Sequence, residues 1–202
     1  MPPKAKYSRE EIIAAALELT REKGIDAVVA RELGKKLGTS SSPIFTAFHN
    51  MEEVQNEVRK AAMRKFGECV SDGGNDAPTF KHVGMKMIQF AIEEPKLFQL
   101  LYMREHKESQ KFEDLIGELG DTADVCLEMI QKEYDLSRYE AEVLFQQTWM
   151  HTFAICVLMA GKVCYFTEKE IVEILGRVVK GTLMLIKSGR LDSGRGYPEN
   201  KG

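Results

Sequence analysis

Residues 30–50, ARELGKKLGTSSSPIFTAFHN, contain two short helical segments on either side of a tight turn. The first segment covers 30–38 and ends at a glycine. The second begins at Pro43, which suits a first helical turn because its missing N–H is not needed there. Between the segments lie Thr39 and three serines, all good N-cap residues. Two short helices joined in this way predict a helix-turn-helix.

A longer helix is expected before this pair, because the sequence holds a complete helix start signal. Ser8 and Glu11 have the spacing of a capping box, in which each residue bonds the backbone amide of the other. Apolar residues then recur at helical spacing up to Gly24, which can end the helix in a left-handed conformation. Residues 8–50 therefore supply three helices with a small core of their own.

The rest of the chain is also helical in pattern, with no convincing strand, internal repeat or low-complexity block. Asn50 can cap a long helix, and the Gly, Asn and Pro residues of 71–78 mark a loop. Ser137 and Thr167 are further N-cap candidates, and each has a glutamate three residues on, the spacing of a capping box. We expect an all-α fold of about nine helices, the later ones at 51–70, 79–93, 95–105, 110–134, 137–161 and 168–188. The expected divisions are a helix-turn-helix domain at 1–50, a helical bundle at 51–188 that opens with the linking helix 51–70, and a flexible tail at 189–202.

Composition and charge suit an ordinary globular protein. Of 202 residues, 44% are hydrophobic and 29% are charged, which argues against disorder and against a fibre. The net charge of -3 gives no overall basic field that would indicate a nucleic-acid partner. The first 50 residues, however, carry eight Lys and Arg against six Asp and Glu, whereas the remainder carries twenty against twenty-five. The first 50 residues are therefore mildly basic, and the rest of the chain is acidic.

Several classes of site and location are disfavoured by missing patterns. The four cysteines form no C-x-x-C pair and no secretory signal precedes them, so we expect reduced thiols in a cytoplasmic protein and no metal site. The longest purely apolar run, 153–160, is far shorter than the roughly 20 residues of a membrane span, so no membrane partner is expected. Neither G-x-S-x-G, H-E-x-x-H nor a phosphate-binding glycine loop is present, so we expect no enzyme activity and no cofactor.

The N-terminal residues resemble the tetracycline-repressor (TetR/AcrR) family of bacterial transcription regulators. The resemblance covers roughly the first 55 residues and rests on the segments IIAAAL (12–17), GIDA (24–27), ARELGKKLG (30–38) and SSSPIFTAFHNMEEV (40–54). It implies an N-terminal helix-turn-helix DNA-binding domain, a linking helix and a C-terminal ligand-binding and dimerisation domain. Val29, Phe45 and Met51 depart from the family, because each lacks the polar group with which the family often contacts phosphate. These departures predict weaker backbone binding, or compensation by nearby lysines.

We expect the second short helix to enter the major groove of DNA while the first braces it. Phe45 is expected to face the groove at least in part, and Phe48 to lie in the core. Other roles remain open for some candidates, since Arg31 could pair with a neighbouring charge, the serines could cap the helix, and His49 could be a plain surface residue. The candidate DNA-binding residues are Arg31, Ser40, Ser41, Ser42, Pro43, Phe45, Thr46, His49 and, in a basic N-terminal arm, Lys6.

The last two expected helices carry more apolar residues than one narrow stripe, so they need cover on several sides. The resemblance implies that they pair with a second copy, although a monomer whose core needs them is the alternative. The candidate dimer interface is Ile171, Ile174, Leu175, Val178, Val179, Thr182, Leu183 and Ile186. Aromatic and Met residues suit an adaptable apolar pocket, although each could be ordinary core. The candidate ligand-binding residues are Met85, Ile88, Phe98, Leu101, Tyr102, Met103, Phe145, Trp149 and Phe153.

Together these features predict a DNA-binding transcriptional repressor. It would bind a pseudo-palindromic operator in double-stranded DNA as a homodimer and be released by a small apolar effector. The alternative is a helical protein-interaction or ligand-binding module that has lost DNA binding, which the departures at Val29, Phe45 and Met51 keep open.

Overall fold

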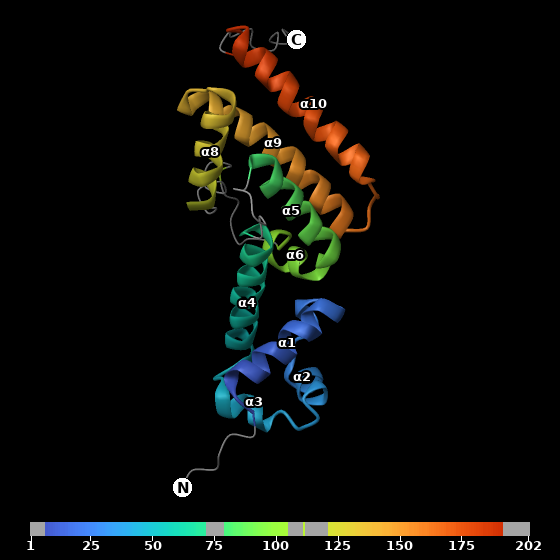
Figure 1. Ribbon diagram of the computed structural model, residues 1–202. Helices are drawn as coiled ribbons and strands as arrows, with labels where there is room; N and C mark the ends of the chain where they lie inside the picture. Colours follow the sequence, from blue (N-terminus) through green and yellow to red (C-terminus); the bar gives the residue numbers. More distant parts are fainter. Residues whose placement is uncertain (1–6, 72–78, 105–110, 112–120, 192–202) are drawn as a thin grey trace, which may run out of the picture. The chain divides into compact units, whose positions relative to one another are not determined.

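The computed structural model describes residues 7–71, 79–104, 111 and 121–191 (Figure 1). Within these ranges the chain forms nine α-helices and one short 3-10 helix, and no strand. The all-α fold of about nine helices is therefore confirmed. In chain order the elements are α1 (Arg9–Lys23), η1 (Ile25–Ala27), α2 (Ala30–Lys36), α3 (Ser42–Ala47), α4 (Met51–Ser71), α5 (Phe80–Glu93), α6 (Pro95–Tyr102), α8 (Asp121–Tyr134), α9 (Arg138–Ala160) and α10 (Glu168–Lys187).

Helices α1, α2 and α3 share a small apolar core, and we call this part of the chain the head. The capping box predicted for α1 is present: the Glu11 amide donates to Ser8 Oγ at 3.2 Å, and the Ser8 amide donates to Glu11 Oε2 at 2.7 Å. Phe48 is 2% exposed and lies in the core, as expected. The other buried apolar side chains of the head are Ile12, Ala16, Leu19, Val28, Leu33 and Ile44.

The long helix α4 connects the head to α5 and α6. Its expected cap is present, because the Glu53 amide donates to Asn50 Oδ1 at 2.8 Å. Early in α4, Val54 and Val58 are fully buried, and the helix contacts α1, α5 and α6. Further along, the ring of Phe66 meets the rings of Phe90 and Tyr102 edge-on, with centroids 5.2 and 5.5 Å apart. Helix α1 also contacts α6 directly, so the head is attached by two routes.

The contacts divide the chain into two compact units. One unit comprises 1–109 with 156–165 and holds α1 to α6, and the other comprises 110–155 with 166–202 and holds α8, α10 and most of α9. In the second unit, Arg138 of α9 pairs with Asp124 of α8 at 2.7 Å. The capping boxes expected at the starts of α9 and α10 are both present. The domain limits expected from the sequence remain predictions.

A few helix ends differ from the sequence-based expectation. Helix α6 ends at Tyr102 and not at 105, where the Met103 amide donates to the Gln99 carbonyl and closes the last turn. Of the helix expected at 110–134, residues 121–134 form α8, whereas residue 111 is not helical. Residues 110 and 112–120 lie outside the described part. Gly24 has a positive φ of 87° but a ψ of 167°, which is outside the left-handed helical region, because the chain turns directly into η1.

Among the described helices, α9 alone has the length and apolar composition to cross a membrane. Its most apolar window has a mean hydropathy of 1.3, and 44% of that window is buried. Core helices of soluble proteins meet the same criterion, so α9 is weak evidence for a membrane span.

Candidate nucleic-acid interface

The turn between α2 and α3 depends on two glycines. Gly38 has a φ of 66°, a conformation that L side chains rarely adopt, and it follows directly after the last turn of α2. The second glycine, Gly34, lies inside α2, and its carbonyl accepts a hydrogen bond from the Thr39 amide at 2.9 Å. A Cβ at Gly34 would lie 3.0 Å from the Thr39 carbonyl oxygen and 3.1 Å from the Ser40 carbonyl carbon. The turn therefore folds back closely over α2, and this fixes where α3 begins.

Helix α3 has one face in the core and one face in solvent. Ile44 is fully buried, whereas Phe45 on the next position is 49% exposed and Thr46 is exposed. The Thr46 hydroxyl donates to the Ser42 carbonyl at 3.1 Å. Ser41 occupies the N-cap position without a side-chain capping bond, so capping does not occupy its hydroxyl. The outward face of α3 therefore offers one aromatic ring and several hydroxyl groups.

The first turn of α2 carries an arginine, Arg31. Arg31 is exposed, and within the described part of the chain it makes no hydrogen bond or ion pair. Its neighbour Glu32 pairs instead with Lys23, with Nζ and Oε2 3.4 Å apart. Lys35, one turn after Arg31, is likewise exposed and unpaired among the described residues. Both side chains are thus available to an outside anion.

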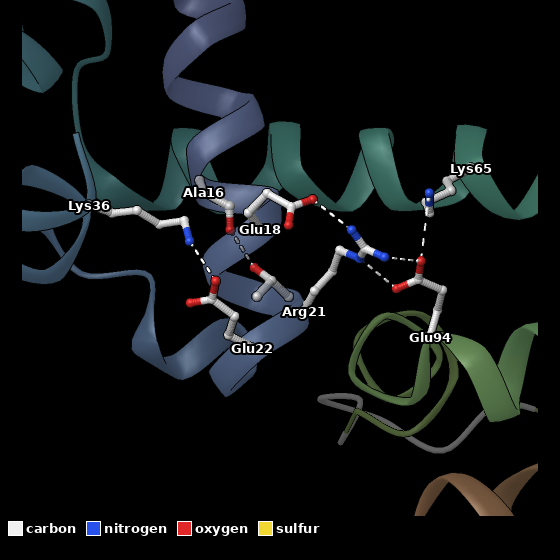
Figure 2. Close-up of polar contacts among 8 residues, drawn as sticks. Ala16, Glu18, Arg21, Glu22, Lys36, Lys65 and Glu94 are labelled. Carbon is white, nitrogen blue, oxygen red and sulfur yellow. Dashed lines mark hydrogen bonds and ion pairs between the residues drawn. The ribbon is translucent and has the colours of Figure 1, made fainter.

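The next lysine on α2 is engaged within the protein. Lys36 Nζ lies 2.7 Å from Glu22 Oε1 of α1 (Figure 2), and this bond lowers the pKa of the Glu22 carboxyl. The pair holds the C-terminal end of α2 against α1. Of the two lysines on α2, Lys35 is therefore the one better placed to meet a phosphate.

Arg9 of α1 holds the far end of α3 in place. Its guanidinium donates to the Ala47 carbonyl and to Glu53 Oε1 of α4 at 2.8 Å, and it lies over the Phe48 ring, 4.0 Å from the centroid. Glu53 also accepts a bond from the His49 amide at 2.8 Å. The His49 amide and the Arg9 guanidinium together lower the pKa of the Glu53 carboxyl. No local spacing in the sequence pairs Arg9 with Glu53, so their role could not be predicted from the sequence.

The remaining candidates of the head occupy a mixture of positions. Val29 is the N-cap of α2, where it makes no side-chain capping bond and is 44% exposed. Met51 is half-buried at the start of α4, and the His49 side chain is exposed. Pro43 lies in the first turn of α3 and is half-buried, and Ser40 and Ser42 are exposed. Lys6 lies outside the described residues.

The head agrees with a known family of sequences. Residues 12–58 match the family model described as bacterial regulatory proteins, tetR family. The head is therefore similar to the bacterial regulatory proteins of the tetR family. The match runs from the core of α1 through the helix-turn-helix to the first third of α4, so it includes the turn glycines and the outward face of α3. A comparison with curated proteins gives no match.

A similarity in fold to solved structures extends beyond the head. One is described as a TetR-family transcriptional regulator from Vibrio parahaemolyticus; it has a TM-score of 0.56 and 18% identity, over 87% of this chain and 96% of that one. Apo ActR from Streptomyces coelicolor gives a TM-score of 0.48 and 14% identity, over 92% of this chain and 99% of that one. The first likeness supports a helical C-terminal part of the tetR type.

The candidate ligand-binding residues fall into both compact units. In the first unit, Ile88 and Phe98 are buried, Met85, Leu101 and Tyr102 are half-buried, and Met103 is 39% exposed. Burial, with a smaller contribution from Cys156, raises the pKa of the Tyr102 hydroxyl. In the second unit, Phe145 and Trp149 are buried and Phe153 is half-buried, and the rings of Trp149 and Phe153 stack at 5.0 Å. The pocket remains a prediction.

The candidate dimer residues all lie on α10. Ile171, Thr182 and Ile186 are buried within the single chain. The other five, Ile174, Leu175, Val178, Val179 and Leu183, are half-buried. Three further apolar side chains of α10, at Val172, Met184 and Leu185, are 39%, 74% and 52% exposed. Within the described part of the chain, no group of three or more His, Cys, Asp and Glu residues could hold a metal ion.

Proposed function

We propose that this tetR-family protein is a repressor that binds a pseudo-palindromic DNA operator through α3. The observation that supports this most directly is the division of α3 into two faces. Ile44 anchors the helix in the core, while the Phe45 ring and the Thr46 side chain lie outward. A short helix held from behind in this way can enter the major groove and present three or four side chains to base edges.

The contacts around α3 support this role. Arg31 and Lys35 have no internal partner among the described residues, so a phosphate or a base edge can take up their charge without breaking a bond in the protein. Ser40 and Ser41 precede α3 and Ser42 begins it, and hydroxyl groups and backbone amides at this helix start can meet a phosphate. Pro43, Phe45, Thr46 and His49 complete the proposed reading surface, with Lys6 in the arm that precedes α1.

The experiment that tests this proposal is a fluorescence-anisotropy titration with the DNA upstream of the gene. Binding should weaken steeply with rising salt, because phosphate contacts release counterions. Arg31→Ala should weaken binding by roughly 1–3 kcal/mol if Arg31 reads a base. Arg177→Ala, which removes an exposed arginine of α10, is the matched control and should bind as the unmodified chain does.

The same titration separates the second candidate function. A helical protein-interaction module that has lost DNA binding is favoured by Val29, Phe45 and Met51, which offer no hydroxyl or amine to phosphate. Such a module would bind no upstream duplex at low salt, and Arg31→Ala would not change its behaviour. That result would overturn the proposed regulator.

A homodimer is proposed because one short helix reads too few bases for a unique site. Two copies with two-fold symmetry would place their α3 helices about 34 Å apart, one turn of the duplex, on a pseudo-palindrome. The half-buried apolar residues of α10 supply a surface that a second copy can cover. In α9, Met150 is 41% exposed and Ala154 is exposed, and they extend the apolar surface available for pairing.

The proposed signal is a small apolar effector that binds among the aromatic and Met residues named above. Binding in one conformational state and not the other would change the spacing of the two heads and lower the affinity for DNA. The protein would work in the cytoplasm, without a membrane partner, a cofactor or a catalytic activity. Titration of the protein–DNA complex with apolar compounds tests release directly, because an effector must dissociate the complex at a concentration that leaves the helical content unchanged.

A further inference from the structure

A bidentate ion pair joins two segments that are 73 residues apart in the sequence. Arg21, in the last turns of α1, donates from Nε to Glu94 Oε2 and from Nη2 to Glu94 Oε1, both at 2.7 Å (Figure 2). Two parallel bonds between a guanidinium and a carboxylate fix both position and orientation. Glu18, one turn earlier on α1, accepts from Arg21 Nη1 at 2.8 Å and so holds the guanidinium in its orientation.

Glu94 occupies the junction of α5 and α6. It ends α5, and Pro95 begins α6 directly after it, so this carboxylate cannot move without one of the two helices. Its side chain is 11% exposed, and Lys65 Nζ of α4 lies 3.6 Å from Oε1. Three helices, α1, α4 and α6, therefore meet at one nearly buried carboxylate. Its negative charge is balanced by two cations from different helices.

The opposite end of α1 is tied to α3. Arg9 donates to the Ala47 carbonyl at the end of α3, and its guanidinium also bonds Glu53. Helix α1 is a single uninterrupted helix from Arg9 to Lys23. Helix α1 thus connects the Glu94 carboxylate to α3, the helix proposed to read DNA. This connection does not pass along α4.

We propose that Glu94 is a positioning residue for operator binding, which sets the orientation of the head relative to α5 and α6 through Arg21. This inference rests on the proposed DNA-binding function. It adds that the orientation depends on one ion pair at the α1–α6 contact as well as on the linking helix. Two heads joined in a dimer must match two half-sites at once, so a loosened head should lose the benefit of simultaneous binding while each head still recognises its own half-site.

The test uses the full chain and a duplex selected from a random pool by the unmodified protein. A second duplex keeps one half-site and has the other scrambled. Glu94→Gln removes the charge while keeping the shape, and it should weaken binding to the complete duplex by about tenfold or more, with less than about a twofold change on the single half-site. Glu93→Gln is the matched control, because it removes the adjacent exposed carboxylate of α5, which bonds Gln89, and leaves the Arg21–Glu94 pair intact.

Two further variants guard against a general folding defect. Arg21→Lys keeps the charge but loses the bidentate geometry. It should therefore weaken binding to the complete duplex less than Glu94→Gln does. The exchange Arg21→Glu with Glu94→Arg should restore binding to the complete duplex relative to either single substitution. Equal losses on both duplexes, or unchanged binding to both, would overturn the positioning role. Failure of the unmodified chain to select any duplex would overturn the proposed function and this inference together.

Discussion

At the scale of single residues, Val29 shows how one missing hydroxyl affects both the fold and the proposed contact with DNA. It stands at the N-cap of α2 with extended backbone angles, the position where Ser, Thr, Asp or Asn normally accepts a bond from an amide of the first turn. No such bond is present, so the first turn of α2 lacks its side-chain cap. Because Val29 is 44% exposed, replacing one of its two methyl groups with a hydroxyl removes little buried apolar surface.

We expect Val29→Thr to raise the free energy of unfolding by roughly 0.5–1 kcal/mol, because the new hydroxyl caps α2. The same hydroxyl should strengthen operator binding by contacting a phosphate. Urea unfolding followed by circular dichroism measures the first effect, and anisotropy measures the second. Val29→Ala is the control that removes the branched side chain without adding a hydroxyl. If threonine and alanine gave the same stability and affinity, the capping argument would be wrong.

At the scale of elements, the turn between α2 and α3 is the most constrained feature of the head. Gly34→Ala would bring a Cβ to 3.0 Å from the Thr39 carbonyl oxygen, and backbone atoms cannot yield as a flexible side chain can. We expect a loss of about 1–3 kcal/mol in unfolding free energy, and weaker DNA binding because the start of α3 must shift. Chemical unfolding and anisotropy measure the two effects.

Gly67→Ala in α4 is the matched control for that substitution. Gly67 is also a helical glycine, but nothing lies within 4 Å of a Cβ added there. Alanine should therefore stabilise α4 by roughly 0.5–1 kcal/mol, the usual gain over glycine inside a helix. Opposite signs for the two substitutions would locate the cause in the close approach at the turn. A gain in stability from Gly34→Ala would refute the proposed constraint.

Local signals in the sequence predicted the elements well. The capping boxes at Ser8, Ser137 and Thr167 were identified from spacing alone, because each bond joins residues three apart and depends on no distant partner. The burial expected for Phe48, which is the C-cap of α3, and the partial exposure expected for Phe45 are both present. The unexpected 3-10 turn has no such signal.

Contacts between distant segments could not be predicted from the sequence. The Arg9–Glu53 pair spans 44 residues and the Arg21–Glu94 pair spans 73, and each is one of many possible pairings among 28 basic and 31 acidic side chains. Which of them meet is decided by the packing of α1 against α4 and α6, and a single sequence does not encode that packing in any local spacing. The residues on the outward face of α3 could thus be predicted from the sequence. The ion pairs that hold α1 against the neighbouring helices could not.

At the scale of the whole molecule, the proposed function requires two copies, and α10 is where that requirement can be tested. Its buried residues, such as Ile171 and Ile186, already serve the core of the single chain. The half-buried Val179 and the 52% exposed Leu185 lie on either side of that buried stripe, whereas Lys180 is exposed on the polar side. A second copy would have to cover at least one of these two flanks.

We expect Val179→Glu or Leu185→Glu to convert the dimer to a monomer, because pairing would then bury an unpaired carboxylate. The mass in solution, measured by light scattering after size exclusion or by sedimentation, gives the result directly. Operator affinity should fall with the mass, and binding to a single half-site should persist. Lys180→Glu, on the polar side of the same helix, should leave the dimer intact. A monomeric unmodified chain, or dimers that survive both flank substitutions, would show that α10 does not form the pairing surface.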